Sequence, residues 1–145
     1  MNFQNMEQSI ERGDIKHRYR AKQINSFAGL IRRRNITPTD IDGIIDYGGK
    51  AFIILEGKYG DAELPKGQKM ALENLANTIL EAKKKSLVIV YRHYVHNVND
   101  DINVSKQLVS DIYFKRKWFE IGFDKTVLQI IEIFENDCDS KNFVL

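Results

Sequence analysis

Residues 42–58 read DGIIDYGGKAFIILEGK, and this stretch carries the clearest strand and turn signals in the chain. Two apolar runs flank Gly48 and Gly49. Because glycine adopts positive φ angles without steric cost, a Gly-Gly pair between β-rich runs favours a tight reversal. We therefore expect two antiparallel strands here. The second has consecutive apolar residues from Ala51 to Leu55, which is typical of a strand covered on both faces.

Charged side chains follow the second apolar run directly. Glu56 and Lys58 are two residues apart, so on a strand they share one face. The reversal at the glycines places Asp42 across from Leu55 or Glu56, whereas Asp46 stays beside the turn. The sequence therefore predicts two carboxylates and an ammonium group around one point.

This combination of charges suits phosphodiester hydrolysis. Asp42 and Glu56 would hold a hard cation, Mg²⁺ or Mn²⁺, and the carbonyl of Gly57 is a candidate third metal ligand. The glycine also leaves room for a substrate backbone. Lys58 would orient or help deprotonate a water molecule and stabilise charge on the phosphate. The alternatives are a surface ion pair at an exposed strand end, for Glu56 and Lys58, and a turn or capping role for Asp42.

The spacing resembles that of the PD-(D/E)xK nuclease superfamily, whose signature is an Asp at the start of one strand and a Glu-x-Lys on the next. Asp42 matches the first position, and Glu56-Gly57-Lys58 matches the second. Such nucleases often carry a glutamine in the first turn of the following helix, where Gln68 stands; the alternative for Gln68 is a contact with loop backbone. The resemblance implies an α/β, restriction-endonuclease-like core. In this core a mixed β-sheet is flanked by helices, in the order αβββαβ.

Three features depart from that pattern. No proline directly precedes Asp42, and Asp40 competes for the same role. The expected first helix, residues 21–34, contains no carboxylate, although an acidic residue is frequent there in the superfamily. Glu7 or Glu11 would have to serve instead.

The remaining apolar patterns predict the other elements and one domain. We expect a flexible basic lead-in over residues 1–20, a nuclease-like domain over 21–135 and a loose tail over 136–145. Helical spacing and apolar runs predict the elements in chain order: helix 21–34, helix 70–80, strand 86–91, a strand pair within 108–121 that turns at Lys115-Arg116, and helix 126–134.

Positive charge is concentrated in the first quarter of the chain. The net charge is only +2, but no carboxylate lies between Asp14 and Asp40, where seven lysines and arginines do. Such a segment attracts polyanions, although a solvated helix face is an equally good interpretation. The residues expected to contact nucleic acid are Arg18, Arg20, Lys22, Arg32, Arg33, Lys66 and Lys69.

Aromatic, basic and histidine residues mix after the strand at 86–91. Tyr91, Arg92 and Tyr94 are suited to stacking on bases and pairing with phosphates, or to a partly buried aromatic cluster. His93 and His96 would point to opposite faces of a strand and have no cysteine nearby, so we expect surface or substrate-contacting histidines rather than zinc ligands.

The expected function is metal-dependent DNA hydrolysis, and the resemblance suggests a role in recombination, repair or phage-host conflict. Many such enzymes pair to cut two strands, so a homodimer is compatible with it. The alternative is a non-catalytic nucleic-acid-binding or partner-binding module on the same fold. The missing first-helix carboxylate and the modest net charge favour this alternative. The single cysteine, Cys138, and the absence of a signal-peptide pattern or an apolar membrane span predict a cytoplasmic protein.

Overall fold

The structure is a computed structural model that describes residues 13–139. The chain divides into two compact units, one ending at Pro38 and one beginning at Thr39. Within the described residues, no helix is both long enough and apolar enough to span a bilayer.

The N-terminal unit does not contain the long helix expected over residues 21–34. From residue 13 on, its helical segments are α2 (Arg18–Ala21) and the 3₁₀ turn η1 (Arg33–Asn35). Between them the Ser26 hydroxyl accepts a hydrogen bond from the Ala28 amide at 2.9 Å, and Gly29 has a φ of 85°. A side chain that bonds to nearby backbone, followed by a left-handed residue, offers the chain an alternative to helical hydrogen bonds. The helix prediction is therefore wrong, although the apolar spacing was helical.

The second unit is built on a five-stranded mixed sheet in the order β1-β2-β3-β4-β5. Only β2 and β3 are parallel, and the helix between them makes the crossover that parallel neighbours need. The strands and helices of this unit are β1 (Gly43–Asp46), β2 (Ala51–Tyr59), α3 (Lys66–Glu81), β3 (Lys85–His93), the 3₁₀ turn η2 (Val104–Lys106), β4 (Leu108–Phe114), β5 (Lys117–Glu120) and α4 (Val127–Asp139).

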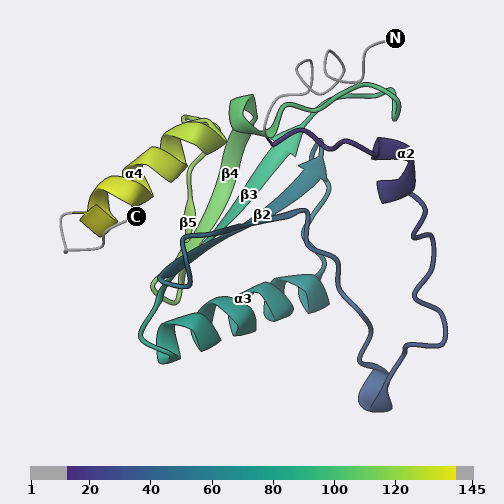
Figure 1. Cartoon of the computed structure of the whole chain (residues 1–145), viewed down its shortest axis with the longest axis horizontal. Coiled ribbons are helices and arrows are strands. Elements are labelled where there is room, and N and C mark those ends of the chain that lie inside the picture. Colours follow the sequence, from purple (N-terminus) through teal and green to yellow (C-terminus); the bar gives the residue numbers. More distant parts are fainter. Residues whose placement is uncertain (1–12, 140–145) are drawn as a thin grey trace, which may run out of the picture. The chain divides into compact units, whose positions relative to one another are not determined.

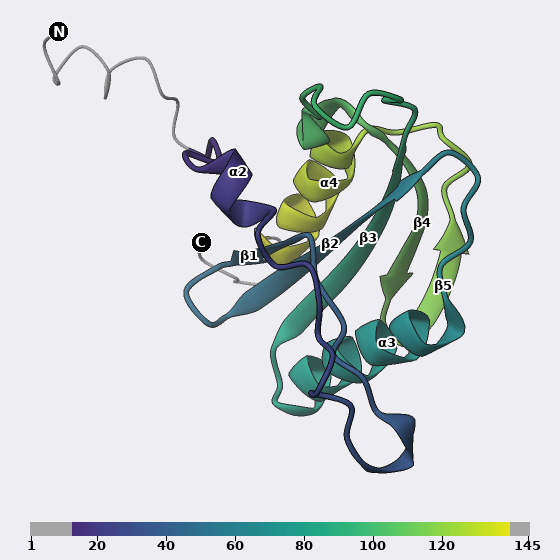
Figure 2. The same cartoon turned by 90° about the vertical axis from the view of Figure 1, so that its right-hand side faces the viewer.

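The two long helices cover opposite faces of the sheet, as Figure 1 shows and the turned view in Figure 2 repeats. On the α3 face, Leu72 and Ala76 pack against Ile54 of β2 and its neighbours on β3 and β4. On the other face, Ile130 and Phe134 of α4 pack against a second apolar cluster. Alternate residues of β2 therefore enter different cores, which confirms the prediction of a strand covered on both sides and the α/β class.

Both predicted hairpins are present. Gly48 and Gly49 have φ angles of 61° and 77°, and Lys115 and Arg116 have 48° and 67°. Positive φ at both central residues matches the right-handed twist of the flanking strands. The second turn has no glycine, so one lysine and one arginine adopt positive φ angles, which are uncommon for residues with a side chain.

The expected element order αβββαβ is wrong for the described residues. Two strands, not three, precede α3, and β3 is followed by a hairpin. The segment before β1 includes Pro38, which has no amide hydrogen to donate to a sheet ladder. At the other end, α4 continues to Asp139, beyond the predicted end at residue 134.

Candidate active site

The candidate site lies where β2 extends beyond the end of its neighbour β1. The last register pair of the two strands is Gly43 with Leu55, whereas β2 and β3 stay paired to Tyr59 and His93. Beyond Leu55, Asp42 takes the place of a strand partner, because its Oδ2 accepts a hydrogen bond from the Gly57 amide at 2.7 Å. The reversal thus places Asp42 beside Glu56, as the spacing predicts.

The other two aspartates of this region lie elsewhere. Asp46 Oδ1 accepts the Gly49 amide at 2.7 Å, so this carboxylate stabilises the turn at the far end of β1. Asp40 is exposed, and the Gly57 amide of β2 donates its hydrogen bond to Asp42 instead. The geometry therefore favours Asp42 over Asp40 as the first acidic residue of the site.

Glu56, Lys58 and Gln68 form a closed triangle of polar contacts on the α3 face. Lys58 Nζ lies 3.1 Å from Glu56 Oε1 and donates to Gln68 Oε1 at 2.7 Å. Gln68 Nε2 donates to Glu56 Oε1 at 2.8 Å. Gln68 is the third residue of α3, so helix α3 fixes the two charged side chains of β2 in one arrangement.

Glu56 is a buried carboxylate with only one of its two oxygens hydrogen-bonded. The residue is 3% exposed, and its Oε2 has no hydrogen-bond partner within the described part of the chain. Burial raises the pKa of Glu56 above its ordinary value, the charge of Asp42 raises it further, and Lys58 and Gln68 lower it in part. An unpartnered carboxylate oxygen close to a second negative charge costs free energy that a bound cation would recover.

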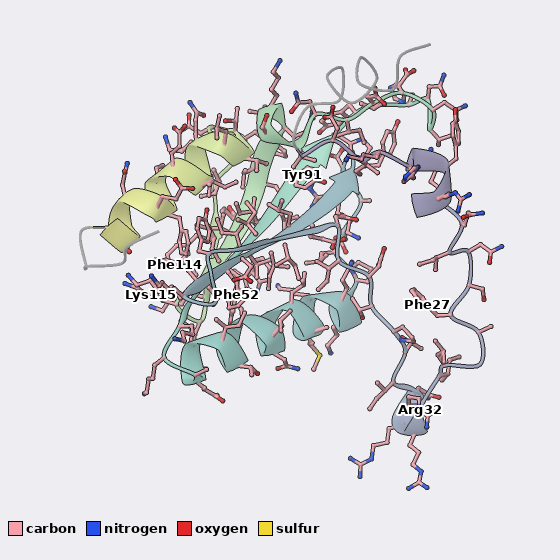
Figure 3. The ribbon with its side chains drawn as sticks, in the orientation of Figure 1. Phe27, Arg32, Phe52, Tyr91, Phe114 and Lys115 are labelled. Atoms are coloured by element: carbon pink, nitrogen blue, oxygen red, sulfur yellow. The ribbon has the colours of Figure 1, made fainter. Side chains whose placement is uncertain are left out.

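The space above Gly57 is occupied by protein, contrary to the expectation that it admits substrate backbone. A Cβ at this position would lie 2.6 Å from the ring and hydroxyl of Tyr91, its register partner on β3. Figure 3 shows Tyr91 at this end of the sheet, with Phe52 and Lys115 at the opposite end. Burial, together with the charges of Asp42 and Glu56, raises the pKa of Tyr91 to about 12. Gly57 is therefore required by packing, and its ring neighbour stays a neutral phenol.

The carbonyl of Gly57 remains a candidate ligand. On a strand, the amide and carbonyl of one residue point to the same side, as they do when paired residues exchange both hydrogen bonds. Since the Gly57 amide points to Asp42, its carbonyl points to the same open edge of β2.

Arg92 has a structural role in this region that the sequence did not predict. Its guanidinium donates to the carbonyl oxygens of Gly60, at 3.4 Å, and of Ala62. Its Nε donates to the Ser110 hydroxyl at 3.3 Å. These bonds tie the loop between β2 and α3 to β3 and β4, and so help to fix the helix turn that carries Gln68. No sequence signal shows this contact, because it depends on the register of a parallel strand pair.

The oxygen donors of the site fit a hard divalent cation for which the protein would supply only some of the ligands. Asp42, Glu56 and the Gly57 carbonyl supply oxygen, which Mg²⁺ prefers, and Mg²⁺ commonly keeps several waters besides one or two carboxylates. Within residues 13–139 there is no cluster of three or more His, Cys, Asp or Glu side chains that could hold a metal. Glu7 and Glu11, the expected additional acids, lie outside the described residues.

The predicted nucleic-acid contacts fall into two groups. Lys66 and Lys69 are exposed in the first turn of α3, next to Gln68, and Lys69 Nζ lies 5.2 Å from the centre of the Trp118 ring. The others belong to the N-terminal unit: Arg18 and Arg20 in α2, Lys22 at its end, and Arg32 and Arg33 at η1.

Comparisons with known proteins do not identify a relative: no protein-family model, curated protein or solved structure matches the chain. The functional interpretation therefore depends on the chemistry of the site itself.

Proposed function

We propose that this chain is a metal-dependent nuclease that hydrolyses DNA phosphodiester bonds with a PD-(D/E)xK type of site, on a variant of the restriction-endonuclease-like core in which two strands, not three, precede α3 among the described residues. One observation carries the proposal. The buried carboxylate of Glu56 has one oxygen bonded to Lys58 and Gln68 and the other without a partner, with the charge of Asp42 nearby. A surface ion pair would be exposed and would not require a glutamine from another element.

Each residue of the site then has a distinct task. Asp42, Glu56 and the Gly57 carbonyl would hold Mg²⁺ or Mn²⁺. When bound, such an ion would neutralise charge on the scissile phosphate and acidify the attacking water. Lys58 orients that water and stabilises negative charge on the phosphate. Gln68 is a positioning residue, because its amide bonds to both Lys58 and Glu56 and fixes their separation.

The surroundings of the site suit an anionic substrate. Lys66 and Lys69 add positive charge at the N-terminus of the 16-residue helix α3, whose partial positive charge acts in the same direction. The basic residues of the N-terminal unit would contribute further phosphate contacts. Binding through such contacts weakens as salt concentration rises, because the entropy gained by releasing counterions falls as their bulk concentration increases.

A cleavage assay tests the proposal. Single-stranded, duplex and branched DNA are incubated with the full chain and with Mg²⁺, Mn²⁺ or a chelator. We expect metal-dependent cutting of at least one substrate, with Asp42→Asn and Glu56→Gln inactive but still able to bind DNA. Glu120→Gln, on the exposed strand β5, and Lys84→Met, after α3, are matched controls that should cut normally.

The alternative, a binding module without catalysis, gives a different result in the same assay. DNA would be retained in a salt-dependent manner, with no product on any of the three substrates with either metal. That outcome would overturn the nuclease proposal.

A further inference from the structure

A cavity lies at the end of the β2–β3 pair, one residue beyond Lys58. Its volume is about 400 Å³, within the range of pockets that hold small ligand groups. Three rings line it, those of Tyr59, His93 and His96, together with the polar residues Asn97 and Asp100. None of these residues has a role in the proposed chemistry at Glu56.

The three rings support one another. Tyr59 and His93 are register partners on β2 and β3, with ring centres 5.6 Å apart. His96 lies on the following loop, with its ring centre 5.5 Å from that of Tyr59, and its Nδ1 is hydrogen-bonded to the Tyr59 hydroxyl. Tyr59 is nevertheless 46% exposed. An exposed aromatic ring that is already held in place loses little conformational entropy when a flat ligand stacks on it.

The polar residues of the cavity select against some ligands. The Asp100 carboxylate repels a phosphate group but accepts a hydrogen bond from an exocyclic amino group of a base. A planar heterocycle with hydrogen-bonding edges fits both the rings and the polar side chains.

We propose that this cavity binds an unpaired nucleobase of the nucleic acid strand that passes the candidate active site. The identity of the substrate rests on the proposed function. A base inside a duplex has its faces stacked and its edge paired, so it cannot enter such a cavity unless it is extruded. The preferred substrate is therefore single-stranded or locally open.

The path from one site to the other is short. Tyr59 lies three residues after Glu56, about 10 Å along the strand. Neighbouring side chains of a strand point to opposite faces, so Lys58 and Tyr59 face different sides of the sheet. A nucleic acid strand reaches both by crossing the edge of β2 that β1 leaves open beyond Leu55.

A binding experiment without divalent cation tests the proposal independently of cleavage. The probe is an oligothymidylate with one 2-aminopurine, whose fluorescence falls when the base stacks. It is titrated with the full chain as a single strand and as a blunt duplex, and the 2-aminopurine mononucleotide is a third arm. We expect the single strand to bind about tenfold more tightly than the duplex and its fluorescence to be quenched.

Variants assign the effect to the cavity. Tyr59→Ala should weaken single-strand binding about tenfold and abolish quenching, whereas Tyr59→Phe keeps the ring and should bind normally. Phe119→Ala, on β5, is the matched control, because Phe119 is 45% exposed, close to the 46% of Tyr59, but does not line the cavity. His96→Ala, at an exposed loop position, should weaken binding in the same direction as Tyr59→Ala and covers the case in which Tyr59→Ala fails to fold.

The outcomes separate this proposal from the nuclease proposal. Equal affinity for single strand and duplex, equal losses in Tyr59→Ala and Phe119→Ala, or quenching of the mononucleotide alone would overturn the base site. Quenching that depends on Tyr59, in a protein that cuts nothing with metal, would support the base site and overturn the nuclease proposal.

Discussion

The two ends of the parallel pair β2–β3 each hold a buried polar atom without a hydrogen-bond partner in the described chain. At the carboxyl end the atom is Glu56 Oε2, and at the start of β3 it is Lys85 Nζ. Lys85 is paired in register with Ala51, directly after the glycine turn. Burial of an ionisable group is thus common to both ends.

The two ends differ in what surrounds the buried charge. Lys58 and Gln68 contact Glu56, and Asp42 raises its pKa. No ion pair or side-chain hydrogen bond of Lys85 is found within residues 13–139. Side chains from several elements converge at the carboxyl ends of parallel strands, which is where α/β sheets commonly carry their ligand sites. Convergence of complementary groups, rather than burial alone, distinguishes the candidate site.

Glu56→Gln should give the largest effect in this comparison. We expect cleavage to fall at least about 10³-fold, because the variant loses the buried negative charge, whereas Lys85→Met should cut at the normal rate. Initial rates on the best substrate, with DNA binding measured in parallel, decide this. If Lys85→Met were as damaging as Glu56→Gln, the contrast between the two ends would be wrong.

The same variant should alter the pH dependence of stability. Because the pKa of Glu56 is raised in the folded protein, folding favours the protonated carboxyl, and the free energy of unfolding falls as pH rises above the ordinary value of 4.5 through the raised pKa. Glu56→Gln lacks this loss. Denaturant unfolding in metal-free buffer at several pH values should show that the free energy of unfolding of the variant increases relative to that of the natural protein as pH rises. A difference that does not change with pH would contradict this assignment.

Lys58→Met should reduce cleavage by about 100-fold and shift its pH profile. In the proposed mechanism cleavage requires ionised Glu56, and Lys58 lowers the pKa of that carboxyl. Without Lys58 the acidic limb of the rate profile should therefore move to higher pH. Gln68→Leu should move it in the same direction by a smaller amount. An acidic limb that stays in place in both variants would show that a different group controls it.

Gly57→Ala should destabilise the protein by about 1–3 kcal/mol, because the new methyl group overlaps the Tyr91 ring. Gly67→Ala is the matched control. Nothing lies within 4 Å of a Cβ at Gly67, and alanine is the better helix former, so this variant should be up to about 1 kcal/mol more stable. Thermal and denaturant unfolding measure both. The substitution Tyr91→Leu should relieve much of the penalty in the double variant, and no relief would place the strain elsewhere.

The smallest effect is expected at the glycine turn between β1 and β2. Gly49 has a φ of 77°, so Gly49→Ala should cost about 1 kcal/mol of stability through backbone strain. Cleavage at a temperature well below unfolding should stay unchanged, since the site lies at the opposite end of β2. A selective loss of cleavage without a loss of stability would show that the two ends are coupled.

Local patterns predicted most of the second unit. The glycine pair, the apolar run into Glu56 and the stripe of α3 each depend on neighbours in the chain, so the hairpin, the helix and the position of Asp42 opposite Glu56 were readable. The apolar spacing over residues 21–34 was equally regular but misleading. There, local bonds at Ser26 and the left-handed Gly29 replace the helix.

Spacing along the chain is enough to predict which residues share a strand face, where the chain reverses and that Glu56, Lys58 and Gln68 occur at compatible positions. Three contacts follow from packing alone: Tyr91 fills the space above Gly57, Arg92 holds the loop before α3, and the rings of Tyr59, His93 and His96 line one cavity. The physical reason is the β2–β3 register. Parallel strands are joined through a long crossover, and no short turn fixes which residues become neighbours.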